Sequence, residues 1–108
     1  MTMKKLNFKA PDQLGIRKAQ HLFDNQWGVS VLSVDAGSKA ADDGIVYASV
    51  EPRTYEVAVI VGHNSNEWTL ADYSDPQMFG NEWPVFAHLD EDKVDSLMER
   101  VSNLEPPF

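Results

Sequence analysis

The sequence predicts an α+β domain, in which a twisted antiparallel sheet of four to five strands carries a C-terminal helix packed on one face. Residues 55–62 form the longest run of β-favouring apolar residues, and an apolar stripe with helical spacing stands near the C-terminus. Short β-type runs separated by polar turns favour antiparallel pairing between neighbours. At 108 residues the chain, 1–108, has the length of a single small domain.

The net charge of −8 is unevenly placed along the chain. Residues 1–20 contain five lysines and arginines and a single aspartate, a net charge of +4, so residues 21–108 carry −12. An acidic body repels nucleic acid and anionic membranes and favours basic partners, although acidity also simply keeps a small protein in solution. We expect no direct contact with nucleic acid or membrane, and a partner protein with a basic surface.

Cysteine is absent, which excludes disulfides and thiolate metal sites and fits a reducing compartment. No apolar run approaches the roughly 20 residues of a membrane span. The basic N-terminus is not followed by the apolar segment of a secretion signal. These features predict a cytoplasmic protein.

The first residues, 1–14, are expected to form a loose basic segment. Leu6 and Phe8 alternate as in a short edge strand, which Pro11 would end.

The next stretch, residues 12–23, is compatible with a helix or with a strand through residues 18–23. Its apolar residues meet the helical period loosely, and Gly15 weakens a helix. Residues 24–26, Asp-Asn-Gln, have the composition of a turn.

Two further β-type runs precede the central one. Residues 27–34 alternate as in a strand, residues 35–44 form a polar loop, and residues 45–50 are a third β-type run.

The run at residues 55–62 should be the central strand. Tyr55 and its valines at 57, 59 and 61 share one face at period two, and the opposite face is mostly apolar. A turn at residues 63–66 then leads to a strand at residues 67–71, which completes a hairpin.

Residues 72–83 are the least regular part of the chain, before a brief strand at residues 85–87. This stretch holds Tyr73, Met78, Phe79 and Trp83 in a polar context. Aromatic and methionine side chains are common anchors of protein interfaces, so these four are candidate partner-binding residues. The alternative is that they fold back over the edge of the sheet.

A helix is predicted over residues 90–104. Asp90 is its expected N-cap, and Leu89 and Val94 form a hydrophobic staple around that cap. The apolar stripe consists of Val94, Leu97, Met98, Val101 and Leu104.

The polar side of this helix carries a row of carboxylates. Glu91, Asp95 and Glu99 recur every four residues, with a rise of about 6 Å between them, and are expected to face solvent. Such a row could imitate the phosphates of a nucleic acid, or it could simply be the solvated face of the helix.

Motifs for chemistry are missing from the sequence. The three histidines lie far apart without metal-ligand spacing, and no phosphate-binding loop, dinucleotide fingerprint or nucleophile elbow is present. The sequence therefore predicts a protein without enzymatic activity, cofactor or metal.

Three stretches resemble a family of small uncharacterised bacteriophage accessory proteins. They are Phe-Asp-Asn-Gln-Trp-Gly-Val-Ser-Val at residues 23–31, Tyr-Glu-Val-Ala-Val at residues 55–59, and His-Leu-Asp-Glu-Asp-Lys-Val at residues 88–94. The resemblance implies a phage gene product in the cytoplasm of the host cell that binds and inhibits a host protein, such as a defence or nucleic-acid-processing component. A virion or assembly-associated protein is the alternative.

Overall fold

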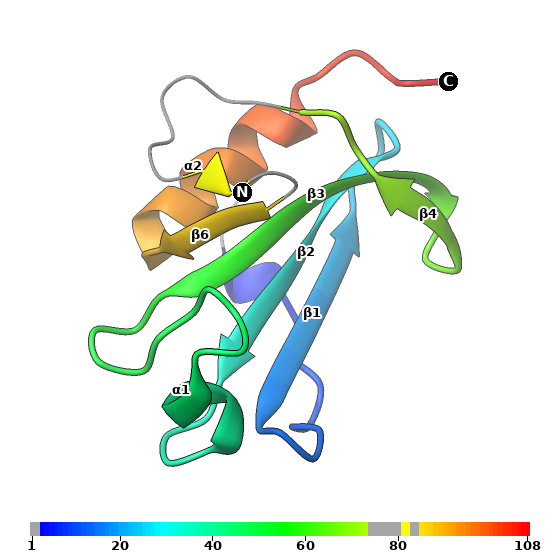
Figure 1. The fold of residues 1–108 in the computed structure, drawn as a ribbon. Helices are drawn as coiled ribbons and strands as arrows, with labels where there is room; N and C mark the ends of the chain where they lie inside the picture. The colour runs from blue at the N-terminus through cyan, green and yellow to red at the C-terminus, as the bar shows by residue number, and fades with distance from the viewer. Residues whose placement is uncertain (1–2, 74–80, 83–84) are drawn as a thin grey trace.

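The computed structural model describes residues 3–73, 81–82 and 85–108, and it confirms an α+β fold (Figure 1). Its antiparallel sheet has the strand order β1-β2-β3-β6-β5, and β4 pairs with a further stretch of β3. The elements in chain order are η1 (Met3–Lys5), β1 (Ile16–Leu22), β2 (Trp27–Val34), α1 (Lys39–Asp43), β3 (Tyr55–Asn64), β4 (Glu67–Leu70), β5 (Asn81–Glu82), β6 (Val85–Leu89) and α2 (Glu91–Ser102).

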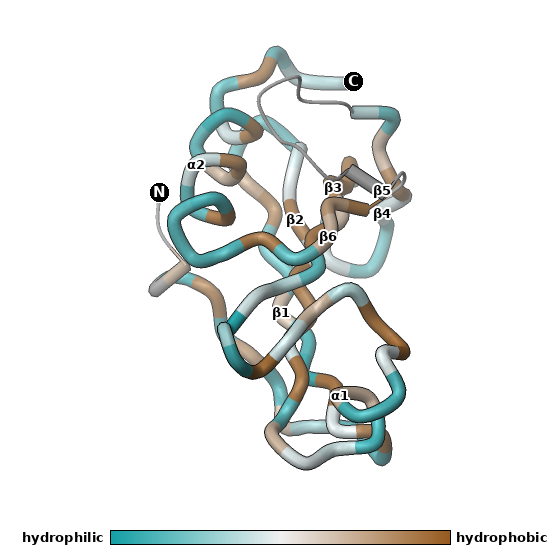
Figure 2. The backbone as a smooth tube through the Cα atoms, turned by 60° about the vertical axis from the view of Figure 1, so that its left-hand side comes forward, coloured by the Kyte–Doolittle hydropathy of each residue, from teal (hydrophilic) through white to brown (hydrophobic). Residues whose placement is uncertain are grey.

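Strand β3 is the centre of the sheet, as its run of valines predicts. β2 pairs along one of its edges, while β6 pairs with the first part of the other edge and β4 with the last part. Val57 and Val59 lie at most 2% exposed in the core beneath α2. The hydrophobic residues of β2, β3 and β6 line the middle of the molecule, whereas the loops are largely hydrophilic (Figure 2).

Helix α2 packs on one face of the sheet, against β2, β3 and β6. The predicted cap is confirmed, because the Asp90 carboxylate accepts a hydrogen bond from the Lys93 amide at 2.9 Å. Four residues of the stripe, Val94, Leu97, Met98 and Val101, have no exposed surface. The helix ends at Ser102, slightly before the predicted end.

The turn between β1 and β2 holds the C-terminal end of α2. Asn25 Nδ2 donates to the carbonyls of Val101 and Leu104, both at 2.9 Å. Carbonyl groups at the end of a helix have no partner within the helix, so this side chain supplies one from the sheet.

Residues 16–22 form strand β1, which settles the ambiguity between helix and strand. Every residue of β1 pairs with β2, from Ile16 opposite Val34 to Leu22 opposite Gly28. The sequence could not distinguish a helix from a strand here, because Ala19 is the one fully buried side chain of β1. A strand with a single buried residue shows no clear alternation of apolar and polar residues.

Residues 3–14 are packed against the domain and form no regular strand, so the expectation of a loose segment is wrong for these described residues. Met3 and Leu6 are buried at 8% exposure, and Phe8 packs on Tyr55 with ring centroids 6.1 Å apart. These apolar side chains join the main core, so the segment passes under the sheet on the side of α2.

Residues 35–50 also differ from expectation. The polar loop contains the short helix α1, capped by the Ser38 hydroxyl and ended by Gly44 in the left-handed region. The run at residues 45–50 is not a strand, apart from an isolated bridge between Ser49 and Thr54. Val46, Ala48 and Val50 instead join a small second core with α1, whereas Ile45 and Tyr47 are exposed.

No helix in the described part of the chain is long and apolar enough to cross a membrane.

Candidate protein-binding site

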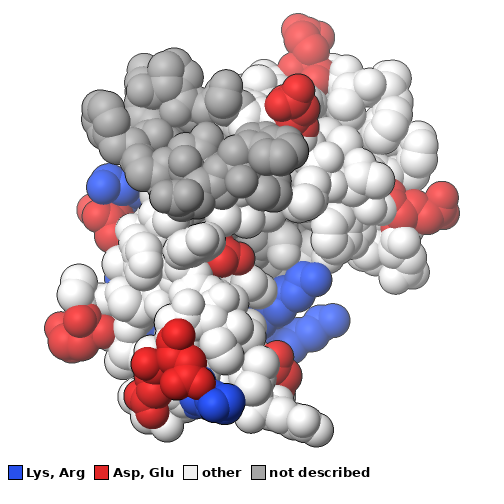
Figure 3. Space-filling model, in the orientation of Figure 1, with Lys and Arg blue, Asp and Glu red and all other residues white. Residues whose placement is uncertain are grey.

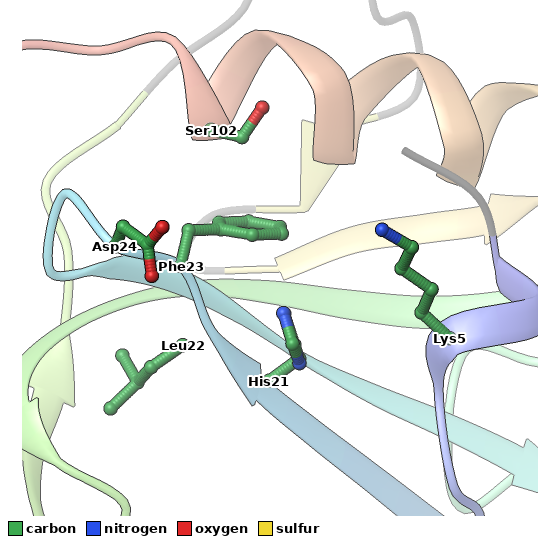
Figure 4. A pocket seen from close by; sticks show the side chains of 6 residues that line it. All are labelled: Lys5, His21, Leu22, Phe23, Asp24 and Ser102. Atoms are coloured by element: carbon green, nitrogen blue, oxygen red, sulfur yellow. The ribbon is translucent and has the colours of Figure 1, made fainter.

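A pocket opens beside strand β1, where three distant parts of the chain meet. It has a volume of about 390 Å³ and is lined by Lys5, His21, Leu22, Phe23, Asp24 and Ser102. In Figure 4 the Lys5 ammonium and the His21 ring reach into the space between η1 and the end of α2, and Phe23 borders that space. The pocket therefore lies on the α2 side of the outer edge of the sheet.

The backbone edge next to this pocket is open. The N-terminal segment covers only the first half of β1, because the Lys9 amide donates to the Lys18 carbonyl and the Asp12 amide to the Ile16 carbonyl, each at 3.0 Å. These bonds show that even-numbered residues of β1 direct their backbone groups outward. Gln20 and Leu22 accordingly present N–H and C=O groups outward, and no described residue forms a backbone hydrogen bond with them on that side.

The open half of the edge follows from where the apolar residues of the N-terminal segment go. Leu6 and Phe8, which precede Lys9 in the chain, pack toward the core. The segment therefore reaches the edge of β1 only at Lys9, and the residues before Lys9 lie away from that edge. Burying Leu6 and covering part of Phe8 is worth more than the few additional edge hydrogen bonds that an extended course would give.

The surroundings of this edge are basic. Lys5 and Lys9 are exposed, and Lys18 lies with its Nζ 5.2 Å from the centre of the Trp68 ring on the opposite side of the sheet. Lys or Arg side chains project beside β1, while Asp and Glu side chains are scattered over the rest of the visible surface with a few further basic ones (Figure 3). Lys9 and Lys18 thus lie beside or on β1, and Lys5 lies in η1 on the other side of the pocket.

The pocket offers groups that bind polar atoms. The His21 ring packs edge-on against Phe23 at a centroid distance of 5.0 Å, which restrains its orientation. The Ser102 hydroxyl donates to the Glu99 carbonyl at 2.7 Å, so its oxygen remains able to accept. With Lys5 and Asp24 the pocket presents a cation, an imidazole and a carboxylate.

Of the four predicted aromatic and methionine anchors, Tyr73 is the one within the described residues. It is half-buried between Trp27 and Phe86, with ring centroids 6.1 and 6.3 Å away. Tyr73 therefore contributes to the core on the α2 face. Met78, Phe79 and Trp83 lie outside the described residues, and their role stays a prediction.

The carboxylate row on α2 is only partly directed to solvent. Glu91 and Glu99 are exposed, but Asp95 is half-buried and accepts a hydrogen bond from the Met3 amide. The expectation that all three face solvent is wrong for Asp95, because η1 packs against this side of α2. A binding role for the row remains a prediction.

A hydroxyl–imidazole chain joins Ser49, Thr54 and His88. The Thr54 hydroxyl lies 2.7 Å from the Ser49 hydroxyl and 3.1 Å from His88 Nδ1, and it also accepts from the Ser49 amide. His88 has a φ of 52°, at an irregularity in the pairing of β6 with β3. Thr54 is 9% exposed and fully engaged, so this chain fixes the loop before β3.

An ion pair stands at the other end of β1. Arg17 Nε lies 2.7 Å from Asp35, and the two side chains form a bidentate contact. The hydrogen bond from Arg17 lowers the pKa of Asp35, and the same bond raises the pKa of Arg17. Among the described residues, no group of three or more metal-ligating side chains comes together.

Sequence reasoning missed the pocket because its lining comes from residues near positions 5, 22 and 102. One feature did point toward it, namely the concentration of lysines and arginines in residues 1–20.

Comparisons with protein families, curated proteins and solved structures find no match to this chain.

Proposed function

We infer that this chain is a non-enzymatic binding protein of a bacteriophage, which engages and inhibits a host protein that has a basic surface. The observation that carries this proposal is the separation of charge by the fold. Residues 1–20 hold a net charge of +4 and supply β1 and the segment beside it, whereas the remaining residues hold −12. A molecule polarised in this way orients an oppositely charged partner before contact.

Helix α2 supports a defined acidic contact surface. Four residues of its apolar stripe are completely buried, which fixes the helix, and Glu91 and Glu99 stand exposed on it. Exposed carboxylates on a rigid helix can occupy the place of phosphates on a basic partner. The proposed inhibition therefore competes with nucleic acid for that partner.

The test is a capture experiment with the purified chain and host lysate, comparing the wild type with Glu91→Lys combined with Glu99→Lys. Asp95 is left unchanged because its carboxylate holds the Met3 amide. We expect the double variant to lose the captured protein, and wild-type capture to fall steeply between about 50 and 200 mM salt.

The matched control reverses two exposed carboxylates elsewhere, Asp42→Lys with Glu51→Lys, and should retain capture. Both variants should melt at the wild-type temperature. Equal capture by the two double variants would contradict a specific role for α2. Sedimentation of the chain with virions, without capture of a host protein, would favour the virion or assembly alternative.

A further inference from the structure

We propose that the open half of strand β1 binds an extended acidic segment of another protein, which adds to the sheet as a new edge strand and places a side chain in the pocket beside it. This surface adjoins the end of α2 but uses the edge of β1, and it goes beyond the proposed function.

The backbone geometry supports strand addition. Gln20 and Leu22 direct two N–H and two C=O groups away from β2, in the arrangement that an incoming antiparallel strand would pair with. The chain already uses this mode at the neighbouring position, where the Lys9 amide binds the Lys18 carbonyl. The free groups continue that pairing line toward the turn after β1.

The pocket gives the added strand a place for a side chain. Residues alternate between the two faces of a sheet, so the side chain beside His21 would point toward α2. That is the side on which Lys5, His21 and Ser102 line the pocket of about 390 Å³. Strand addition supplies affinity through the backbone, and such a pocket supplies selectivity.

The lysines around the open half of β1 favour an acidic segment as the incoming strand. Lys5 lies on the α2 side of this edge, Lys18 on the opposite side, and Lys9 at its end, against Asp24 near the turn. Carboxylates on either face of the incoming strand would therefore meet an ammonium group. A second copy of this chain, paired through its own β1, is the competing occupant that the experiment below distinguishes.

The experiment uses short fluorescent peptides with the full-length chain. The first alternates threonine with glutamate, the second alternates threonine with lysine, and the third is the glutamate peptide N-methylated at alternate residues. We expect the glutamate peptide to bind, and the other two to bind at least about tenfold more weakly, since they lose charge pairing or backbone hydrogen bonds.

Amide hydrogen exchange locates the site on the protein. The Gln20 and Leu22 amides should gain protection in the presence of the glutamate peptide. Lys5→Glu should weaken binding about tenfold, whereas Lys93→Glu, the same change at an exposed lysine on α2, should leave it unchanged.

Gln20→Pro removes one outward N–H at a position where an edge strand tolerates proline, and it should weaken binding with the fold retained. If that variant does not fold, the N-methylated peptide still tests the backbone contact. Equal binding of the glutamate and lysine peptides, unchanged exchange at Gln20 and Leu22, or a dimer through β1 that excludes the peptide would each overturn the proposal.

Discussion

Asp35 shows how a single exposed side chain can make stability depend on pH. Arg17 holds the carboxylate in a bidentate contact, and the hydrogen bond lowers the pKa of Asp35 in the folded chain. A depressed folded-state pKa adds stability above the unfolded-state pKa of the group. That contribution is lost as the pH falls through the folded-state pKa.

We therefore expect Asp35→Asn to lower stability slightly at neutral pH and to make no difference at pH values below both pKa values. The effect should be small because both side chains are more than a third exposed. Urea unfolding at pH 7 and at a pH low enough to protonate Asp35 in both states measures it. A variant that is equally destabilised at both pH values would show that Asp35 acts through something other than its charge.

At the scale of the element, α2 contributes four fully buried side chains to the main core. Leu97 is fully buried at the centre of its stripe. Leu97→Asp would place a carboxylate without a partner among apolar side chains, and we expect a loss of several kcal/mol in the free energy of unfolding. Ser96→Asp, at the exposed neighbouring position, is the matched control and should change little. An unchanged melting temperature in the Leu97 variant would show that α2 does not pack in the core.

The elements also differ in how far the sequence predicts them. β3 and α2 were predictable because their buried residues recur at the period of the element. β1 was not, because an edge strand with a single fully buried residue has too few apolar positions to show a period. Residues 45–50 have β-favouring side chains, yet the run does not form a strand, and Val46, Ala48 and Val50 pack in the small core beside α1. Local preference could not reveal that contact.

The site was less predictable than the fold. The lining of the pocket depends on the course of the N-terminal segment, which is set by where Leu6 and Phe8 find space in the core. That placement depends on contacts between residues far apart in the sequence. Composition alone indicated only that the region is basic. The acidic row was visible in the sequence, but the contact of Asp95 with Met3 was not.

For the whole molecule, the N-terminal segment should be a structural part of the domain. Leu6→Ala removes a buried side chain from the main core, and we expect a loss of about 2–4 kcal/mol. Asn7→Ala, at the exposed neighbouring residue, should have little effect. Denaturant unfolding of the two variants compares them. Equal stability would show that the segment contributes nothing to the fold.

The contacts of α2 have a consequence for synthesis of the protein on the ribosome. Met3 binds Asp95, and Asn25 binds the carbonyls of Val101 and Leu104, so segments translated early depend on one translated much later. Until α2 has emerged, the valines of β2 and β3 lack the cover of α2, and on that face the N-terminal segment covers them only in part. The nascent chain must therefore expose an apolar sheet surface that chaperones recognise, and cooperative folding waits for residues near position 104.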